Sequence, residues 1–221
     1  KPAIKKNFDA RLKVLNKFVD RAHHRSLLEI GSAYGYFLEL ASAHFDSVTG
    51  VDITVEGVEY CRNILDLDVH LGDLPSWDFD KKAFDVVCMW DTIEHLSEPN
   101  VYLEKIANHL SPGGLLAITT GDIESILARF RKHRWRLIHP PTHVHYFSER
   151  TLRRLLESLN FKIIHVEYCG SYRTVDSMAY SITAGRPLFR SLYGATKTLK
   201  LLNWSLYLNL FDIMFVIAER R

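Results

Sequence analysis

The sequence predicts an α/β fold with a doubly wound, seven-stranded, mostly parallel sheet and helices on both of its faces. Short apolar runs alternate along the chain with segments in which apolar residues recur at helical spacing. The apolar runs are almost uninterrupted, as expected for parallel strands that are buried on both faces. A chain of 221 residues suits one such unit with a modest appendage. We therefore assign residues 1–221 to a single domain.

The expected elements alternate along the chain. Strands are predicted at residues 26–30, 47–53, 69–71, 84–90, 115–120, 161–168 and 210–218. Helices are predicted at residues 8–19, 36–45, 55–65, 99–110 and 148–159. Pro99 suits the first turn of its helix because a backbone N–H has no partner there. Ser148 suits an N-cap because its hydroxyl can accept a hydrogen bond from the following turn.

Three segments lie outside this alternation. Residues 1–25 form an N-terminal helix region, and residues 122–139 are basic and irregular. Residues 170–209 are too long for a simple connection, and we predict a helical insertion there, before the last strand. Within it, residues 185–210 fit a basic amphipathic helix. Such a helix can serve as a substrate lid, a homodimer surface or a peripheral membrane contact, and core packing is the plain alternative.

Composition limits the classes of function. The formal net charge of +2 gives no overall attraction to nucleic acid, which is therefore not an expected partner. The basic and aromatic cluster at residues 129–136 is either a solvated loop or a grip for a phosphate or another acidic group. Three widely separated cysteines, together with no evident secretory signal, favour a cytoplasmic protein with free thiols.

A glycine-containing turn follows the first strand, where residues 27–37 read LLEIGSAYGYF. Gly31 and Gly35 allow backbone angles that are costly for other residues, and they let a ligand approach the main chain. A tight turn without a ligand is the alternative. The segment lacks the G-x-G-x-x-G spacing of dinucleotide sites, which disfavours a nicotinamide-dependent oxidoreductase.

Two aspartates follow the next two strands. Asp52 can accept hydrogen bonds from the ribose hydroxyls of a nucleoside, or it can cap the helix that follows. Asp73 can accept a bond from an adenine amino group while Leu74 and Ile53 pack on the base, or it can belong to a plain acidic turn. Ligands of parallel sheets bind beyond the carboxyl ends of the strands, so both aspartates and the glycine turn are expected along one rim.

These motifs resemble the class I family of methyltransferases that depend on S-adenosylmethionine (SAM). LLEIGSAYGYF resembles the family's glycine-rich first motif, VDI its acidic second and HLGDL its adenine-binding third. FDVVCMWDTIEHL and LSPGGLLAITT resemble the segments that follow. The PPTHVHYFS stretch is similar to the ubiquinone-biosynthesis O-methyltransferase group. One departure is Ala33, where many members carry glycine, and we expect SAM binding to be retained.

The resemblance implies a Rossmann-like methyltransferase fold with SAM as cofactor and S-adenosylhomocysteine as product. Glu29 and the backbone around Gly31 would hold the methionine portion, Asp52 the ribose, and Asp73 with Leu74 the adenine. The backbone at residues 89–90 would line the sulfonium side. The full expected set is Glu29, Gly31, Ser32, Ala33, Tyr34, Gly35, Asp52, Ile53, Asp73, Leu74, Met89 and Trp90.

Three histidines are candidates for the base that methyl transfer to a protonated nucleophile requires. His95 follows the fourth strand and so faces the rim, whereas His143 and His145 share a face if their segment is extended. Local hydrogen bonding that orders the loops is the alternative for all three. Asp91, Glu94 and His95 also give a short D-x-x-E-H pattern that a divalent cation can use, but we predict no metal because such patterns are common.

We therefore expect an enzyme that methylates a small molecule, most simply at a hydroxyl oxygen. Sugars, nucleotide-linked sugars, quinones and phenols are the candidate acceptors. A SAM-fold module that binds a partner without catalysis is the first alternative, and a nicotinamide-dependent oxidoreductase is the second.

Overall fold

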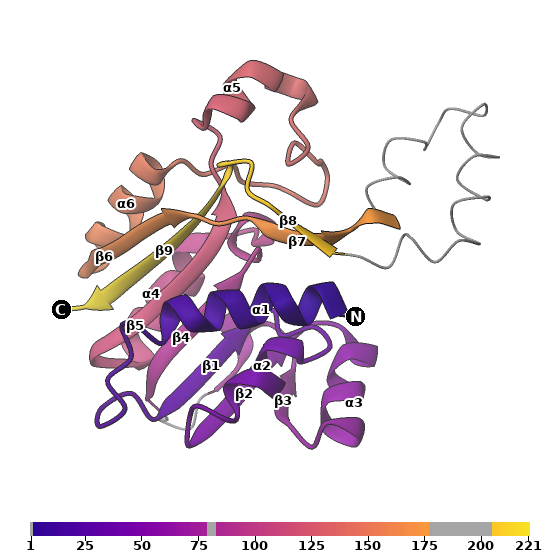
Figure 1. Cartoon of the computed structure of the whole chain (residues 1–221). Coiled ribbons are helices and arrows are strands. Elements are labelled where there is room, and N and C mark those ends of the chain that lie inside the picture. Colours follow the sequence, from indigo (N-terminus) through magenta and orange to yellow (C-terminus); the bar gives the residue numbers. More distant parts are fainter. Residues whose placement is uncertain (1, 79–82, 177–204) are drawn as a thin grey trace.

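A computed structural model describes residues 2–78, 83–176 and 205–221 (Figure 1). Seven strands form one sheet in the order β3-β2-β1-β4-β5-β9-β6, and two further strands, β7 and β8, pair as a separate antiparallel ribbon. The strands are β1 (Ser26–Ile30), β2 (Ser47–Asp52), β3 (Asp68–Leu71), β4 (Phe84–Trp90), β5 (Leu110–Gly121), β6 (Phe161–Tyr168), β7 (Ser171–Thr174), β8 (Ser205–Leu208) and β9 (Ile213–Arg220).

Helices cover both faces of this sheet. The α-helices are α1 (Pro2–Leu15), α2 (Tyr36–Ala41), α3 (Val55–Ile64), α4 (Pro99–His109), α5 (Ile126–Arg131) and α6 (Glu149–Ser158). Short 3₁₀ helices are η1 (Leu74–Ser76), η2 (Ile93–His95) and η3 (Lys132–Arg134). The side chain of Ser148 caps α6 in a capping box with Thr151, as its position before the leucine-rich helix predicts.

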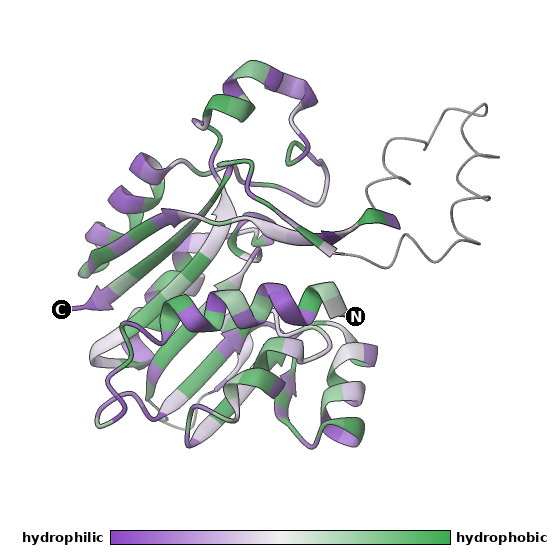
Figure 2. Cartoon of the chain, viewed as in Figure 1, coloured by the Kyte–Doolittle hydropathy of each residue, from purple (hydrophilic) through white to green (hydrophobic). Residues whose placement is uncertain are grey.

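Neighbouring residues of the central strands enter different cores. Leu27 and Val86 pack with α1, α2 and α3 on one face of the sheet, whereas Leu28 and Val87 pack with α4 and α6 on the other. Because side chains alternate between the faces of a strand, two cores require apolar residues at nearly every strand position. Figure 2 shows these strands as predominantly hydrophobic.

The direction of the strands creates the rim that the sequence predicts. Strands β1 to β5 pair in parallel, and only β9 is antiparallel to its neighbours β5 and β6. The carboxyl ends of β1 to β4 therefore meet at one edge of the sheet. The doubly wound, mostly parallel sheet with helices on both faces is confirmed.

Two expectations for the second half of the chain need correction. Residues 122–139 are not irregular throughout, because they contain α5 and η3. The expected helical insertion at residues 170–209 is wrong at both described ends, which form β7 and β8. Tyr172 and Tyr207 pair across this ribbon with ring centroids 5.1 Å apart, a contact between distant residues that helical periodicity cannot reveal.

The middle of that segment, residues 177–204, lies outside the described residues, as does most of the expected amphipathic helix at 185–210. Among the residues that are described, no helix has the length and apolar character needed to cross a membrane. Cys61, Cys88 and Cys169 are free thiols, and Cys88 is fully buried as its apolar surroundings predict.

Candidate active site

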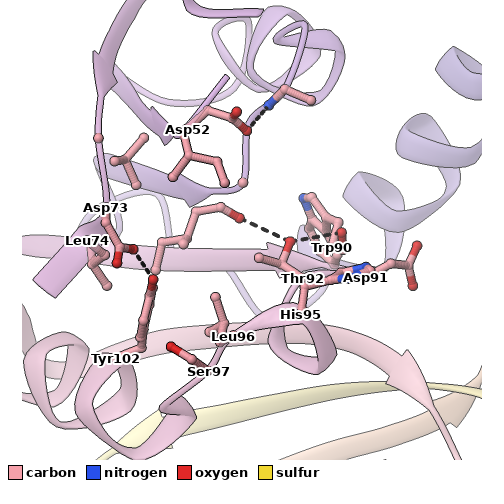
Figure 3. Close-up of a pocket in the computed structure, with 16 residues that line it drawn as sticks. Asp52, Asp73, Leu74, Trp90, Asp91, Thr92, His95, Leu96, Ser97 and Tyr102 are labelled. Carbon is pink, nitrogen blue, oxygen red and sulfur yellow. Dashed lines mark hydrogen bonds between the residues drawn. The ribbon is translucent and has the colours of Figure 1, made fainter. Parts of the chain in front are cut away.

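A cavity of about 540 Å³ opens at the carboxyl edge of the parallel strands (Figure 3). It is formed by the loops that follow β1 to β4 and by the start of α4. Its lining residues are Ile30, Gly31, Ala33, Val51, Asp52, Ile53, Gly72, Asp73, Leu74, Trp90, Asp91, Thr92, His95, Leu96, Ser97 and Tyr102. The loops that the sequence assigns to one rim therefore surround one cavity.

The turn after β1 has an unusual backbone. Gly31, Ala33 and Gly35 have φ angles of 78°, 46° and 67°, a left-handed region that favours glycine. A Cβ atom added to Gly31 would lie 2.7 Å from the Thr92 hydroxyl oxygen, so a larger residue does not fit. The glycine spacing in the sequence thus reflects both the backbone angles and the close approach of the loop after β4.

Asp52 closes this turn from the end of β2. Its carboxylate accepts hydrogen bonds from the backbone N–H of Ala33 at 2.7 Å and from the backbone N–H of Thr54 at 2.8 Å. The Thr54 hydroxyl donates to the same carboxylate. Asp52 is also part of the cavity wall and is 9% exposed. The structure is thus compatible with both interpretations of Asp52 from the sequence. The side chain orders the start of α3, as a helix cap would, and it faces the cavity, as a ribose ligand would.

Asp73 is paired with a residue that the sequence does not single out. The hydroxyl of Tyr102, near the start of α4, donates a hydrogen bond to the Asp73 carboxylate, and Figure 3 shows the two side chains meeting at one side of the cavity. Leu74 is buried beneath them, whereas Ile53 is 73% exposed. Asp73 and Ile53 therefore present a carboxylate and an apolar side chain to the same space.

Two buried carboxyl groups lie close to the cavity. Burial holds the pKa of Glu29 well above its usual range, and the neighbouring charge of Asp52 adds to the shift. One Glu29 oxygen has no hydrogen-bond partner among the described residues. Burial, followed by the charge of Asp91, likewise raises the pKa of Glu94, which accepts a hydrogen bond from the Thr120 hydroxyl at 2.8 Å.

The expected cofactor residues divide into two groups. Gly31, Ala33, Asp52, Ile53, Asp73, Leu74 and Trp90 line the cavity; Glu29, Ser32, Tyr34, Gly35 and Met89 do not. Within the second group, Glu29, Ser32 and Met89 are buried, and Gly35 is the N-cap residue of α2. The Tyr34 ring packs instead against Tyr36 and Tyr60. The second group lies behind or beside the cavity wall, and the cofactor roles of both groups stay predictions.

Only one of the three candidate histidines lines the cavity. His95 is exposed there, and its Nδ1 lies 2.7 Å from the carbonyl oxygen of Thr142. His143 packs edge-on against His95, and burial followed by the His95 charge lowers its pKa. The Nε2 of His145 lies 3.2 Å from the carbonyl oxygen of Ser97. His143 and His145 thus hold the loop before α6 against the segment around η2. This arrangement fits the alternative in which these histidines order the loops.

The residues that could hold a metal ion differ between the sequence pattern, Asp91, Glu94 and His95, and the folded structure. Potential ligand atoms of Glu94, His95 and His143 lie within 4.8 Å of one another. Asp91 is not part of this group, and its carboxylate instead accepts hydrogen bonds from Arg11 at 2.6 Å and from the Thr119 hydroxyl at 3.0 Å. The expectation that no metal is needed stays a prediction.

The rule that places ligands beyond strand ends puts residues 90–96 at the rim, and Thr92 and Leu96 of this stretch line the cavity. Two further lining residues, Ser97 and Tyr102, were not found from the sequence. Ser97 directly follows that stretch, so the same rule could have found it. Tyr102 lies within a helix, and only the packing of α4 beside η1 brings it to Asp73.

Comparison with known proteins identifies the family. The model of a methyltransferase domain family matches residues 4–166. A ubiquinone biosynthesis O-methyltransferase of Coxiella burnetii is 25% identical over 101 residues, covering 43% of each chain. A fatty-acid O-methyltransferase of Mycolicibacterium smegmatis is 29% identical over 100 residues, covering 43% of this chain and 36% of that protein. The chain thus matches less than half the length of these curated relatives.

A solved structure agrees at the level of the fold. The SAM-dependent methyltransferase from Archaeoglobus fulgidus superposes with a TM-score of 0.64 at 20% identity, covering 98% of this chain and 94% of that one. The chain therefore belongs to the class I family of SAM-dependent methyltransferase domains. The resemblance that its motifs suggest is confirmed.

Proposed function

We propose that this protein transfers the methyl group of SAM to a hydroxyl oxygen of a small-molecule acceptor. The observation that carries the proposal is the meeting of Asp52, Asp73 and His95 around one cavity at the carboxyl edge of the sheet. Carboxylates on successive strand ends suit a nucleoside, and a histidine at the same rim suits proton removal.

The lining residues fit SAM in size and chemistry. A cavity of about 540 Å³ lies in the usual range for a small-molecule site. Asp52 and Asp73 would accept hydrogen bonds from the ribose hydroxyls and the adenine amino group, with Leu74 and Ile53 against the base. The unpartnered Glu29 oxygen beneath the glycine turn supports a cationic group nearby, as the ammonium of methionine would be. Trp90 and the backbone beside it would line the sulfonium side.

When bound, SAM supplies an electrophilic methyl group whose transfer to oxygen leaves a neutral thioether. The protein contributes orientation and a proton acceptor. The Thr142 carbonyl can only accept a hydrogen bond, so the Nδ1 of a neutral His95 carries the proton. The Nε2 lone pair is then available to remove the proton of the acceptor hydroxyl. We assign His95, rather than His143 or His145, as the base.

Oxygen as the methyl acceptor also has support from the relatives. The two curated relatives described above are both O-methyltransferases by name, one in ubiquinone biosynthesis and one for fatty acids. Their identity to this chain is low and partial. They therefore support oxygen, and they leave the choice among sugars, nucleotide-linked sugars, quinones and phenols to experiment.

Calorimetric titration with SAM and with S-adenosylhomocysteine tests the proposal first. We expect saturable binding with one molecule per chain. Screening of hydroxylated acceptors for production of S-adenosylhomocysteine follows. A folded protein that binds neither molecule would exclude methyl transfer and favour the partner-binding alternative. Binding without turnover, even when candidate protein partners are added, would point to a non-catalytic module.

A further inference from the structure

A second, smaller cavity of about 240 Å³ lies next to the first. Helix α1, the β7–β8 ribbon, the start of β9 and the loop after β4 form its walls. Its lining residues are Asn7, Arg11, Asp91, Arg136, Cys169, Gly170, Ser171, Arg173, Leu208, Leu210, Asp212 and Ile213. Asp91 belongs to both cavities, so the second cavity adjoins the proposed cofactor site.

Positive charge is in excess in this second cavity. Three arginines face two aspartates among its lining residues. Arg11 pairs with Asp91 at 2.6 Å, and Arg136 pairs with Asp212 at 2.8 Å. Arg173 is exposed on β7 and has no ion-pair partner among the residues that the structure describes. The Arg173 guanidinium is therefore available to bind an anion. Arg136, in the same cavity, keeps hydrogen-bond donors that its pair with Asp212 does not use.

The free hydrogen-bonding capacity of Arg136 follows from its geometry. A guanidinium carries five N–H donors, and one recorded hydrogen bond, from a terminal nitrogen of Arg136 to Asp212, uses a single donor. Its side chain is 38% exposed, whereas that of Asp212 is 2% exposed. The buried Asp212 carboxylate therefore holds one side of the Arg136 guanidinium, and the other N–H donors of this group are available to a ligand in the cavity.

Hydrogen bonds between distant segments also hold the walls in place. Trp135 donates from its indole N–H to Asp212 at 2.8 Å, which fastens the segment after α5 to the start of β9. Asn7 on α1 donates from its side chain to the Tyr172 carbonyl of β7 at 3.3 Å and accepts from the Tyr172 N–H. These hydrogen bonds therefore fix the positions of the segments that carry the three arginines.

Asp91 connects the two cavities. Its backbone adopts a left-handed φ of 51°, and its N–H bonds to the Thr119 carbonyl at 3.0 Å. In Figure 3 its carboxylate points away from Asp73, out of the row of residues that surround the first cavity. The main chain thus lines the proposed methyl-donor site while the side chain pairs with Arg11 in the second cavity.

We propose that the second cavity binds a carboxylate or phosphate group of the methyl acceptor through Arg136 and Arg173. This inference rests on the proposed methyltransferase function and adds the chemical class of the acceptor, a hydroxylated molecule that carries an acid group. Guanidinium groups bind both kinds of acid in a fork geometry, which orients the acceptor as well as attracting it. The acid group would hold the acceptor beside Asp91, with its hydroxyl toward the first cavity.

Anion titrations of the full chain test this proposal. The probes are inorganic phosphate and benzoate, titrated by calorimetry into protein saturated with S-adenosylhomocysteine. We expect at least one probe to bind. Arg173→Gln should weaken its binding about tenfold or more, because hydrogen bonds to a charged group are strong. Arg136→Lys, which keeps the charge near Asp212 but loses the fork, should weaken it as well. The probe that binds distinguishes a phosphate site from a carboxylate site.

Arg154→Gln is the matched control, because Arg154 is an exposed arginine on α6 that lines neither cavity. It should leave the affinity for either probe unchanged. Binding of S-adenosylhomocysteine without binding of either anion would overturn the acid-group proposal and leave the methyltransferase proposal standing. Equal weakening by Arg173→Gln and Arg154→Gln would overturn it too, as nonspecific attraction. If an anion binds but S-adenosylhomocysteine does not, the methyltransferase proposal is overturned. The acid-group proposal, which rests on it, is then overturned as well.

Discussion

The Asp52 carboxylate accepts a hydrogen bond from the backbone N–H of Ala33 at 2.7 Å and thereby ties the end of β2 to the glycine turn after β1. The residue proposed to bind the ribose thus also holds the loop beneath the cofactor. Loss of its side chain should affect binding and folding together.

Asp52→Ala should lower the affinity for S-adenosylhomocysteine at least about tenfold, since hydrogen bonds to a charged group are lost. It should also lower the free energy of unfolding by about 1–3 kcal/mol, because N–H groups of Ala33 and Thr54 lose their partner. Calorimetry and chemical denaturation measure the two effects. Asp46→Ala, at an exposed aspartate paired with Arg25, is the control. Unchanged affinity in folded Asp52→Ala would rule out the ribose assignment.

Ala33 occupies a backbone conformation that favours glycine, with φ of 46°. Ala33→Gly should leave the free energy of unfolding within about 1 kcal/mol of the original, because relief of strain opposes the greater entropy of the unfolded chain. Ala33→Val should destabilise the protein by about 1–3 kcal/mol and weaken S-adenosylhomocysteine binding, since a β-branched residue tolerates this region poorly. Thermal unfolding checks both. A valine variant as stable as the glycine variant would contradict this explanation of the turn.

The sequence predicts the sheet well because burial on both faces leaves a local signal. The expected bounds of β1, β4 and β6 agree with the observed ones, and β1 and β4 are short, mostly apolar runs. The rim follows from strand direction alone, so seven of the twelve expected cofactor residues line the cavity. Residues such as Glu29 and Met89 precede the strand ends, and their side chains enter the cores.

The remaining features depend on contacts between distant residues. Tyr102 reaches Asp73 only because α4 packs beside η1. The β7–β8 ribbon joins residues 171–174 to 205–208, and nothing local in either segment reveals the pairing. Arg136 stands in a basic cluster in the sequence, but its position in the second cavity depends on buried Asp212, 76 residues later. Such contacts require the tertiary structure.

Tyr102→Phe removes the hydroxyl that orients Asp73. We expect a loss of about 0.5–1.5 kcal/mol in the free energy of unfolding. The affinity for SAM should fall severalfold while kcat at saturating SAM stays unchanged, because the adenine end is remote from the reacting carbon. Tyr60→Phe, in the aromatic group outside the cavity, is the control. An affinity change equal to that of the control would remove Asp73 and Tyr102 from the adenine site.

Glu94 should make stability depend on pH. Burial, with the Asp91 charge second, raises its pKa in the folded protein. The protonated carboxyl of Glu94 therefore contributes its full stability below the pKa that this group has in the unfolded chain. That contribution is lost as pH rises through the higher pKa of the folded protein. Glu94→Gln keeps an acceptor for the Thr120 hydroxyl and removes the titration.

The difference in unfolding free energy between Glu94→Gln and the original protein should therefore shift in favour of the variant as pH rises from about 4 to about 8. Chemical denaturation at a series of pH values measures this difference. Glu104→Gln, at an exposed glutamate, is the control for the substitution itself. A parallel curve for Glu94→Gln would mean that its carboxyl titrates alike in the folded and unfolded chains.

His95 is the proposed base because its Nδ1 is held by the Thr142 carbonyl while its ring faces the first cavity. With an acceptor found by screening, His95→Ala should lower kcat by about 10²–10⁴-fold and leave S-adenosylhomocysteine affinity unchanged. His145→Ala should change stability more than kcat, because His145 does not line the cavity and bonds the carbonyl oxygen of Ser97. If His95→Ala retains kcat within about threefold, proton removal does not depend on this residue, since a general base contributes at least about a hundredfold.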